Sequence, residues 1–204
     1  MKTFLLAVAT LASAVCTTAS AQQTADKLKP GDKMPGAEVN MPNANGEPTT
    51  LQKSVGQNGI LVMFSCNTCP FVVRNQAMTK RTMAYCKAHG IGMVVLNSNE
   101  AQRDAADAYE AMQKYAKEQG YTVPYLVDNN SKLADMYGAN HTPEIFLFDS
   151  KGRLVYKGAM NDNPGDPSAF KHVYIEEAIN AMIAGKTPDP QETRSVGCSI
   201  KRRS

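Results

Sequence analysis

The sequence predicts an α/β protein with a mixed central β-sheet covered by helices. Two continuous apolar runs, at residues 59–65 and 92–97, are typical of strands buried on both faces. A helical pattern follows each run, and a strand–helix–strand crossover requires parallel neighbours. A Lys151-Gly152 turn between two further apolar segments adds an antiparallel hairpin at one edge. The predicted sheet therefore contains both kinds of pairing.

The first half of the domain contributes an extension, a strand and a long helix. Asn45-Gly46, inside residues 38–51, predicts an N-terminal β-hairpin of two short strands. The first buried strand comes next. After it, we expect one helix from about residue 68 to residue 89, which Gly90 would end.

The remaining elements each have a local signal. Residues 104–119 carry an apolar stripe at helical spacing and end at Gly120, and residues 174–184 repeat the pattern. The other predicted elements are short strands at 92–97, 123–127, 144–148 and 154–157 and a short helix at 131–137. We expect residues 22–185 to form one domain and residues 186–204 to form an irregular tail.

The first 21 residues predict an export signal outside the fold. Lys2 gives a positive start, residues 4–15 are apolar but too few to span a membrane, and Ala-Ser-Ala at 19–21 has the pattern of a cleavage site. An uncleaved anchor is the alternative, and a lipid anchor on Cys16 is disfavoured by the bulky residue before it. We therefore expect residues 1–21 to be a signal peptide and the mature protein to be periplasmic or secreted, without a membrane span.

Charge and cysteine content argue against a nucleic-acid-binding protein and against a small disulfide-stabilised scaffold. The formal net charge of +3 gives no basic footprint for nucleic acid. Five cysteines are too few for a disulfide scaffold in a chain of 204 residues, so an apolar core must carry the stability.

Cys66-x-x-Cys69 is the most informative motif, because it follows the first buried strand at the predicted start of a helix. Backbone N–H groups and the helix dipole favour a thiolate on the first sulfur, and the spacing lets the second sulfur close a small ring. The pattern indicates thiol–disulfide exchange. We expect Cys66 to be the exposed, low-pKa nucleophile and Cys69 to be the more buried resolving thiol.

Two other uses of the motif remain open. A structural disulfide needs no further residues. A zinc site needs two more ligands, and the sequence has no second CxxC. A c-type haem needs His after the second cysteine, where Pro70 stands. We expect neither a cofactor nor a bound metal.

Several motifs together resemble a known family. They lie at residues 66–72, 123–128, 137–139, 142–144 and 197–201. With them the chain resembles, over roughly residues 28–204, the peroxiredoxin-like redoxins of the thioredoxin superfamily, often grouped with alkyl hydroperoxide reductase and thiol-specific antioxidant proteins. The resemblance implies a thioredoxin-like fold. With the export signal and the CxxC motif, we expect an exported thiol–disulfide oxidoreductase. Its partners would be protein or small-molecule disulfides and a thiol electron donor.

The chain differs from both peroxiredoxins and thioredoxin at positions that matter for their chemistry. Gly59 and Met63 stand where peroxiredoxins have Pro and a Thr or Ser that orients the peroxide. Ile60 and Ser65 stand where thioredoxin has a buried Asp and a Trp. We therefore expect disulfide exchange to dominate. A thiol peroxidase, a metal-binding thioredoxin-fold protein and a non-catalytic binding module are the alternatives.

The same resemblance implies a cis bond before Pro143, facing the CxxC motif. Thr142 would then have a free backbone edge for a bound partner; the alternative is an ordinary loop proline before an edge strand. His141 and Glu144 flank the loop and are candidate proton acceptors for the thiols, or simply surface residues.

Cys86 and Cys198 complete the thiols. Cys86 lies about 25 Å from Cys69 along the same predicted helix, too far to join it in a disulfide. We therefore expect Cys86 to be a buried free thiol. Cys198 follows Gly197 in the predicted tail. It is a candidate third redox thiol, a candidate partner of Cys86, or a bystander.

Overall fold

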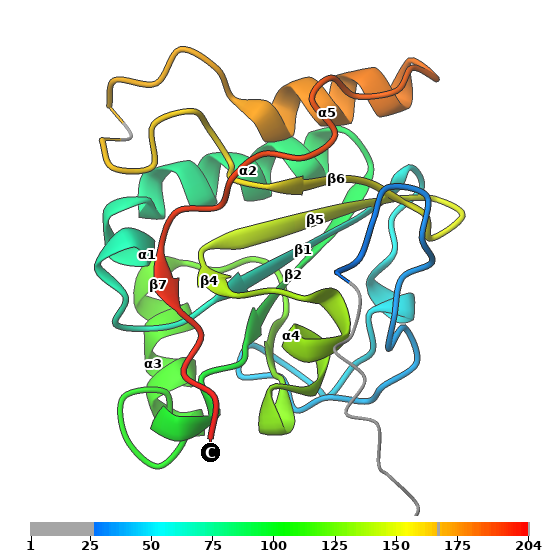
Figure 1. Ribbon diagram of the computed structural model, residues 1–204. Helices are drawn as coiled ribbons and strands as arrows, with labels where there is room; N and C mark the ends of the chain where they lie inside the picture. Colours follow the sequence, from blue (N-terminus) through cyan, green and yellow to red (C-terminus); the bar gives the residue numbers. More distant parts are fainter. Residues whose placement is uncertain (1–26, 167, 204) are drawn as a thin grey trace, which may run out of the picture.

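A mixed five-stranded sheet lies at the centre of the computed structural model, which describes residues 27–166 and 168–203 (Figure 1). The strands, in sheet order, are β3 (Tyr125–Val127), β2 (Ile91–Asn97), β1 (Gly59–Ser65), β5 (Glu144–Asp149) and β6 (Leu154–Gly158). β1 and β3 are parallel to β2, whereas β5 is antiparallel to β1 and β6. The predicted mixed sheet is confirmed, and the predicted signal peptide lies outside the described residues.

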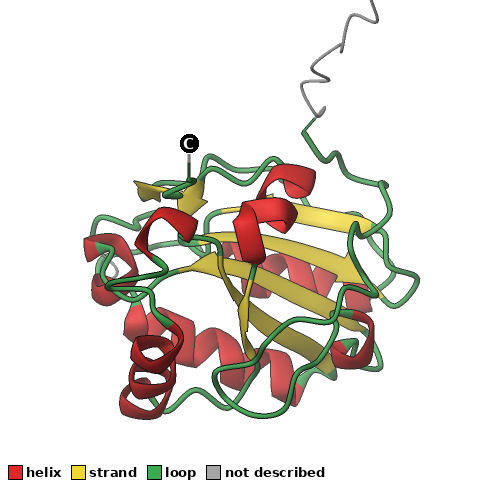
Figure 2. Ribbon diagram, turned by 90° about the horizontal axis from the view of Figure 1, so that it is seen from below, coloured by secondary structure: helices red, strands yellow, loops and turns green. Residues whose placement is uncertain are grey.

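Helices cover both faces of this sheet (Figure 2). They are α1 (Pro70–Arg74), α2 (Gln76–Ala88), α3 (Tyr109–Gln119), α4 (Lys132–Tyr137) and α5 (Tyr174–Ile183), with 3₁₀ turns η1 (Gln52–Ser54), η2 (Glu100–Gln102) and η3 (Asn129–Ser131). None of the helices in the described part of the chain is long and apolar enough to cross a membrane.

Two large apolar clusters form most of the core in the described residues, one on each face of the sheet. Alternate residues of β1 divide between them, since successive strand side chains point to opposite faces. Leu61 and Met63 join the side chains of α2, α3 and α5, and Val62 and Phe64 join those of α4 and the N-terminal segment. Every residue of β1 is buried, which explains its continuous apolar sequence.

The single helix expected over residues 68–89 is wrong. Asn75 separates α1 from α2 with φ −92° and ψ 13°. Its side-chain amide donates to Phe71 O at 2.8 Å and to Pro164 O at 2.9 Å. A short amide side chain that bonds to backbone carbonyls competes with regular helix geometry, and here it also ties the helix break to a distant loop.

The expected N-terminal hairpin is reduced to one bridge, between Met41 and Thr49. Two residues further on, Asn43 bridges Leu126 of β3 instead, and its side-chain oxygen accepts from the N–H of Tyr125 at 3.0 Å. The segment therefore pairs with the edge of the central sheet, which leaves no second strand for a hairpin.

The helix expected from residue 104 begins at Tyr109, because the preceding residues serve a polar loop. Arg103 in this loop donates to the backbone carbonyls of Asn97 and Asp107 at 2.8 and 2.7 Å. Asp107 is completely buried, and its carboxylate accepts from groups outside the loop. These contacts hold residues 103–107 in turns and delay the start of α3.

The C-terminal tail is packed against the domain rather than loose. Its strand β7 (Cys198–Ser199) pairs antiparallel with β4 (His141–Thr142), outside the central sheet, and the red β7 arrow in Figure 1 lies close to α1. Ile200, which follows β7, is only 5% exposed. A two-residue pairing of this kind has no periodic signal, so the sequence pattern suggested an irregular tail.

Candidate functional site

The two thiols of the CxxC motif lie at the junction of β1 and α1. Cys66 directly follows the strand, and Cys69 directly precedes the helix, whose first residue is Pro70. Proline suits that position because its missing N–H would have no partner there. Both cysteines are free, with 2% of Cys66 and 4% of Cys69 exposed. The predicted junction is confirmed, but the expected exposure of Cys66 is wrong, since neither thiol is open to solvent.

Thr142 brings a distant loop against both sulfurs. Its hydroxyl lies 3.6 Å from Cys66 Sγ, and its backbone oxygen accepts from Cys69 Sγ at 3.2 Å. The Thr142–Pro143 bond is cis, as the resemblance implied. The backbone of Thr142 is not free, however, because it pairs with Cys198 of β7. The expected open edge is thus already occupied by the chain's own tail.

Cys198 is the third thiol at this site. It contributes with Cys66 and Cys69 to the wall of a cavity of about 180 Å³, which Lys201 and Gln102 also line. Cys198 packs against the cluster of Cys66, Cys69 and Val72, and its proximity lowers the pKa of Cys69. Cys86 belongs to a different cluster, in the core beneath α2. The structure therefore brings Cys198 to the motif and not to Cys86.

The pKa values of the two motif thiols, Cys66 and Cys69, depend on each other. A hydrogen bond with Cys66 lowers the pKa of Cys69 to about 4, and further hydrogen bonds from Cys198 and Thr142 act in the same direction. The same bond to Cys69, together with burial, raises the pKa of Cys66. A thiolate on one sulfur is thus stabilised by the remaining S–H of the other, and the first proton loss belongs to the pair. Two proton arrangements of the pair are therefore possible, and they differ in which sulfur carries the charge.

In the second proton arrangement, Cys69 keeps its proton and Cys66 carries the charge, and both sulfurs again have hydrogen-bond partners. When Cys69 keeps its proton, it can donate to Thr142 O, the acceptor 3.2 Å away. Cys66 then accepts from the backbone N–H of Cys69 and from the Thr142 hydroxyl, two contacts that lower the pKa of Cys66. Proton transfer along the Cys66–Cys69 hydrogen bond therefore converts one reactive form into the other.

His141 and Glu144 do not reach the sulfurs. The Glu144 carboxylate accepts from the backbone N–H groups of Asn140 and His141 at 2.8 and 3.0 Å, and His141 Nδ1 lies 3.0 Å from Ser195 Oγ. Both residues line a separate cavity of about 420 Å³. Their expected role as proton acceptors has no support in this geometry, and they fasten the loop and the tail instead.

Asp107 is a site residue that sequence reasoning missed. One carboxylate oxygen accepts from the backbone N–H of Asn67, inside the CxxC motif, at 2.9 Å, and from Asn97 Nδ2 at 2.7 Å. The other oxygen accepts from Asn99 Nδ2 at 3.0 Å. The Asp107 charge also raises the pKa of Cys66. The only local signal was the polar Asn-Ser-Asn sequence at residues 97–99, directly after a buried strand.

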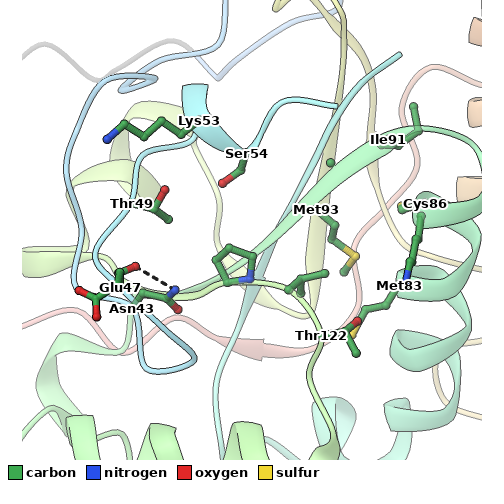
Figure 3. A pocket seen from close by; sticks show the side chains of 14 residues that line it. Asn43, Glu47, Thr49, Lys53, Ser54, Met83, Cys86, Ile91, Met93 and Thr122 are labelled. Atoms are coloured by element: carbon green, nitrogen blue, oxygen red, sulfur yellow. Dashed lines mark hydrogen bonds between the residues drawn. The ribbon is translucent and has the colours of Figure 1, made fainter. Parts of the chain in front are cut away.

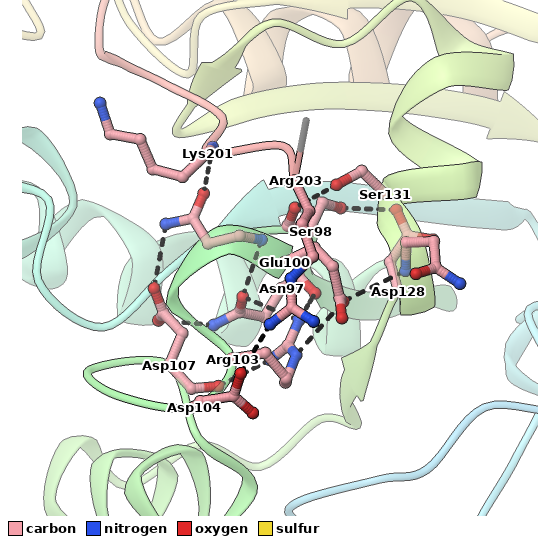
Figure 4. Close-up of polar contacts among 12 residues, drawn as sticks. Asn97, Ser98, Glu100, Arg103, Asp104, Asp107, Asp128, Ser131, Lys201 and Arg203 are labelled. Carbon is pink, nitrogen blue, oxygen red and sulfur yellow. Dashed lines mark hydrogen bonds and ion pairs between the residues drawn. The ribbon is translucent and has the colours of Figure 1, made fainter.

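The network around Asp107 extends to the tail (Figure 4). Asn99 donates to Asp107 and accepts from the backbone N–H of Lys201 at 2.9 Å. One buried carboxylate therefore positions both the CxxC loop and the segment that follows Cys198.

A larger cavity, of about 540 Å³, lies away from the motif (Figure 3). Cys86, Met83 and Met93 line one side of it, and Lys53 and Glu47 line the other. Burial raises the pKa of Cys86 to about 12, so this thiol stays protonated at neutral pH. The expectation of a buried free thiol is confirmed, although Cys86 lies on α2 and not on the helix that Cys69 begins.

No group of three or more His, Cys, Asp or Glu side chains arranged to hold a metal ion is found within residues 27–166 and 168–203.

Comparison with known proteins agrees with this architecture. A thiol-disulfide oxidoreductase ResA from Halalkalibacterium halodurans is 23% identical over 119 residues, which cover 57% of this chain and 63% of that protein. An uncharacterised conserved protein from Geobacillus kaustophilus is 31% identical, with a TM-score of 0.78 over 87% of this chain and 94% of its own. A putative thiol:disulfide interchange protein DsbE from Chlorobium tepidum has the same fold at 18% identity, with a TM-score of 0.56 over 78% of this chain and 98% of its own.

The family assignment rests on the greater part of the chain. The model of the Redoxin family matches residues 29–174, which include β1, the CxxC motif and the Thr142–Pro143 loop. The chain therefore belongs to the Redoxin family and has the thioredoxin-like fold.

Proposed function

We propose that this protein is an exported thiol–disulfide oxidoreductase that uses Cys66 and Cys69 as a reversible dithiol. One observation carries the proposal: Cys66 Sγ and Cys69 Sγ both contact Thr142, at 3.6 and 3.2 Å, in a site whose contacts stabilise a thiolate. The substrates would be protein or small-molecule disulfides, and a thiol donor would restore the reduced form.

The reaction conserves sulfur and electrons at each step. Cys66 thiolate attacks one sulfur of the substrate disulfide, that S–S bond breaks, and a mixed disulfide forms with Cys66. Cys69 then loses its proton to the departing substrate thiolate and attacks Cys66 Sγ. The other substrate thiolate takes a proton from solvent, so the substrate leaves as a dithiol, and the protein retains a Cys66–Cys69 disulfide. Two electrons have passed from the protein to the substrate.

Peroxide reduction is the second candidate, and one contact favours it. Met63 offers no hydroxyl, but the Thr142 hydroxyl lies 3.6 Å from Cys66 Sγ and could orient a peroxide there. Reduction of a peroxide by Cys66 would give a sulfenic acid and release water or an alcohol. Attack by Cys69 would then form the same Cys66–Cys69 disulfide and release a second water.

Insulin reduction and hydrogen peroxide consumption, measured side by side, should separate the two functions. We expect rapid insulin reduction and slow peroxide consumption, because Met63 replaces the Thr or Ser that orients the peroxide in peroxiredoxins. Thr142→Val is the matched variant, since it removes the hydroxyl and keeps the branched shape. It should reduce the residual peroxide consumption more than insulin reduction, which also slows because the hydroxyl lowers the pKa of Cys66. Peroxide turnover faster than insulin reduction would instead make the protein a peroxidase.

The proposed export depends on residues 1–21, and it can be tested directly. Expression of the full chain with its own N-terminus in a Gram-negative host should yield a periplasmic product. Its intact mass should correspond to residues 22–204, because the Ala-Ser-Ala pattern directs cleavage before Gln22. A full-length product that stays in the cytoplasm would contradict export without affecting the thiol chemistry.

A further inference from the structure

The tail is anchored on both sides of Cys198, so the position of this thiol is fixed by the fold. On the N-terminal side, Thr193 donates its N–H to Lys157 O at 3.0 Å, and its hydroxyl accepts from the N–H of Ala159 at 3.0 Å. On the C-terminal side, the N–H of Ile200 donates to Asn140 O at 2.9 Å. The anchors leave only a short segment between them, and Cys198 lies within it.

The residue before Cys198 allows the tail to approach the Thr142–Pro143 loop. A Cβ added to Gly197 would lie 2.1 Å from Thr142 O and 2.7 Å from Thr142 C. These are backbone atoms of a packed loop, which cannot move aside as a flexible side chain would. Only glycine therefore permits the pairing of Cys198 with Thr142 that brings the third thiol to the motif.

Cys69 is the sulfur that the two other thiols share. Cys66 and Cys198 both lie beside it, since the three residues line one cavity and Cys198 packs against the cluster that holds Cys66 and Cys69. An S–S bond needs Cβ atoms about 3.5–4.5 Å apart, a separation reached only by cysteines that already pack side by side. Cys69 is thus placed to form a disulfide with either neighbour.

We propose that Cys198 is a third redox thiol, which exchanges with Cys66 as the disulfide partner of Cys69. The inference rests on the proposed function, because it begins from the Cys66–Cys69 disulfide. Cys198 thiolate attacks Cys69 Sγ, the Cys66–Cys69 bond breaks, and a Cys69–Cys198 bond forms. Cys66 leaves as a thiolate and takes up the proton that Cys198 gave up. The exchange is an isomerisation, so no oxidant or reductant enters it.

The exchange has two consequences for the protein. It frees the Cys66 sulfur while the protein as a whole stays oxidised. It also links the tail covalently to the start of α1, over the backbone edge of Thr142. The Cys69–Cys198 form is therefore a closed state, and the Cys66–Cys69 form is the one that reacts with a dithiol donor at Cys66.

The first test removes the competing partner. The full-length mature protein carrying Cys66→Ser is incubated with excess oxidised dithiothreitol, quenched in acid and mapped by peptide mass spectrometry. We expect a Cys69–Cys198 disulfide in most molecules. Gly197→Val in the same background should lower that yield at least about fivefold, because the tail can no longer approach Thr142. Cys69 and Cys198 both remaining alkylatable, or a Cys86–Cys198 bridge, would overturn the proposal.

The second test follows the exchange in wild-type protein. Each oxidised molecule has one free thiol among Cys66, Cys69 and Cys198, and alkylation with N-ethylmaleimide at pH 7 identifies it. We expect some molecules labelled at Cys66 and the others at Cys198. Labelling of Cys198 alone, in protein that has formed the Cys66–Cys69 disulfide, would overturn the exchange and leave the proposed function intact. Absence of any Cys66–Cys69 disulfide would contradict the proposed function itself.

Discussion

In a Cys198→Ser background, which removes the Cys69–Cys198 pair, Cys66→Ser should abolish insulin reduction, by about a thousandfold or more. In the same background Cys69→Ser should react once and then accumulate as a mixed disulfide with its substrate. Loss of a nucleophile has an effect of this size because the remaining groups have no alternative route to the product. The asymmetry follows from the proposed roles, because Cys66 forms the mixed disulfide and Cys69, which lies against the same Thr142, releases the substrate. Turnover assays and intact-mass analysis after one equivalent of substrate measure both effects.

Cys86→Ser is the matched control for both variants. It also replaces a buried free thiol, but one in the core cluster beneath α2. Its turnover should stay within about twofold of wild type at a temperature where it remains folded. The outcome that contradicts the assignment is a mixed disulfide trapped on Cys69 in the Cys66→Ser variant. The roles of the two sulfurs would then be reversed, and the hydrogen-bond donors around Cys69 would determine the nucleophile.

Asp107→Asn should destabilise the protein by about 2–4 kcal/mol, because the new amide places a donor where the carboxylate accepted three hydrogen bonds. The Asn99 side chain cannot turn to compensate, since its oxygen already accepts from the N–H of Lys201. The variant should therefore loosen the tail as well as the CxxC loop. Urea unfolding gives the stability change, and the alkylation rate of Cys198 in reduced protein reports the tail.

The same substitution should change the pH dependence of the thiols. The negative charge of Asp107 raises the pKa of Cys66, so its removal should lower that pKa. Alkylation of Cys66 would then begin at a lower pH than in wild type. Asp104→Ala is the control, since Asp104 is an exposed neighbour whose ion pair with Arg203 contributes at most about 1 kcal/mol. Equal effects of the two variants would argue against a specific role for Asp107.

Elements whose signals are local could be predicted from the sequence. The run at residues 59–65 is buried on both faces and was recognisable because all its side chains are apolar or small. The strand–turn–helix context of Cys66 and Cys69 was recognisable in the same way, and family resemblance supplied the cis bond before Pro143.

Elements that depend on distant partners could not be predicted. Asn75 interrupts the helix through a bond to Pro164, far along the chain. Asp107 looked like an ordinary residue in the first turn of a helix, because nothing local shows that Asn67, Asn97 and Asn99 converge on it. Polar networks and short strand pairs are formed by tertiary structure, and neither leaves a periodic pattern.

The pairing of β7 with β4 also limits which molecules can bind to the backbone of Thr142, because β7 already occupies it. A polypeptide that pairs through its main chain would have to displace a strand that belongs to the same molecule. A tethered segment acts at an effective concentration on the order of millimolar, well above that of most free partners. The tail thus selects against partners recognised by extended backbone alone. The partners that remain are those whose disulfide can enter the cavity beside Cys66 without opening the strand pair.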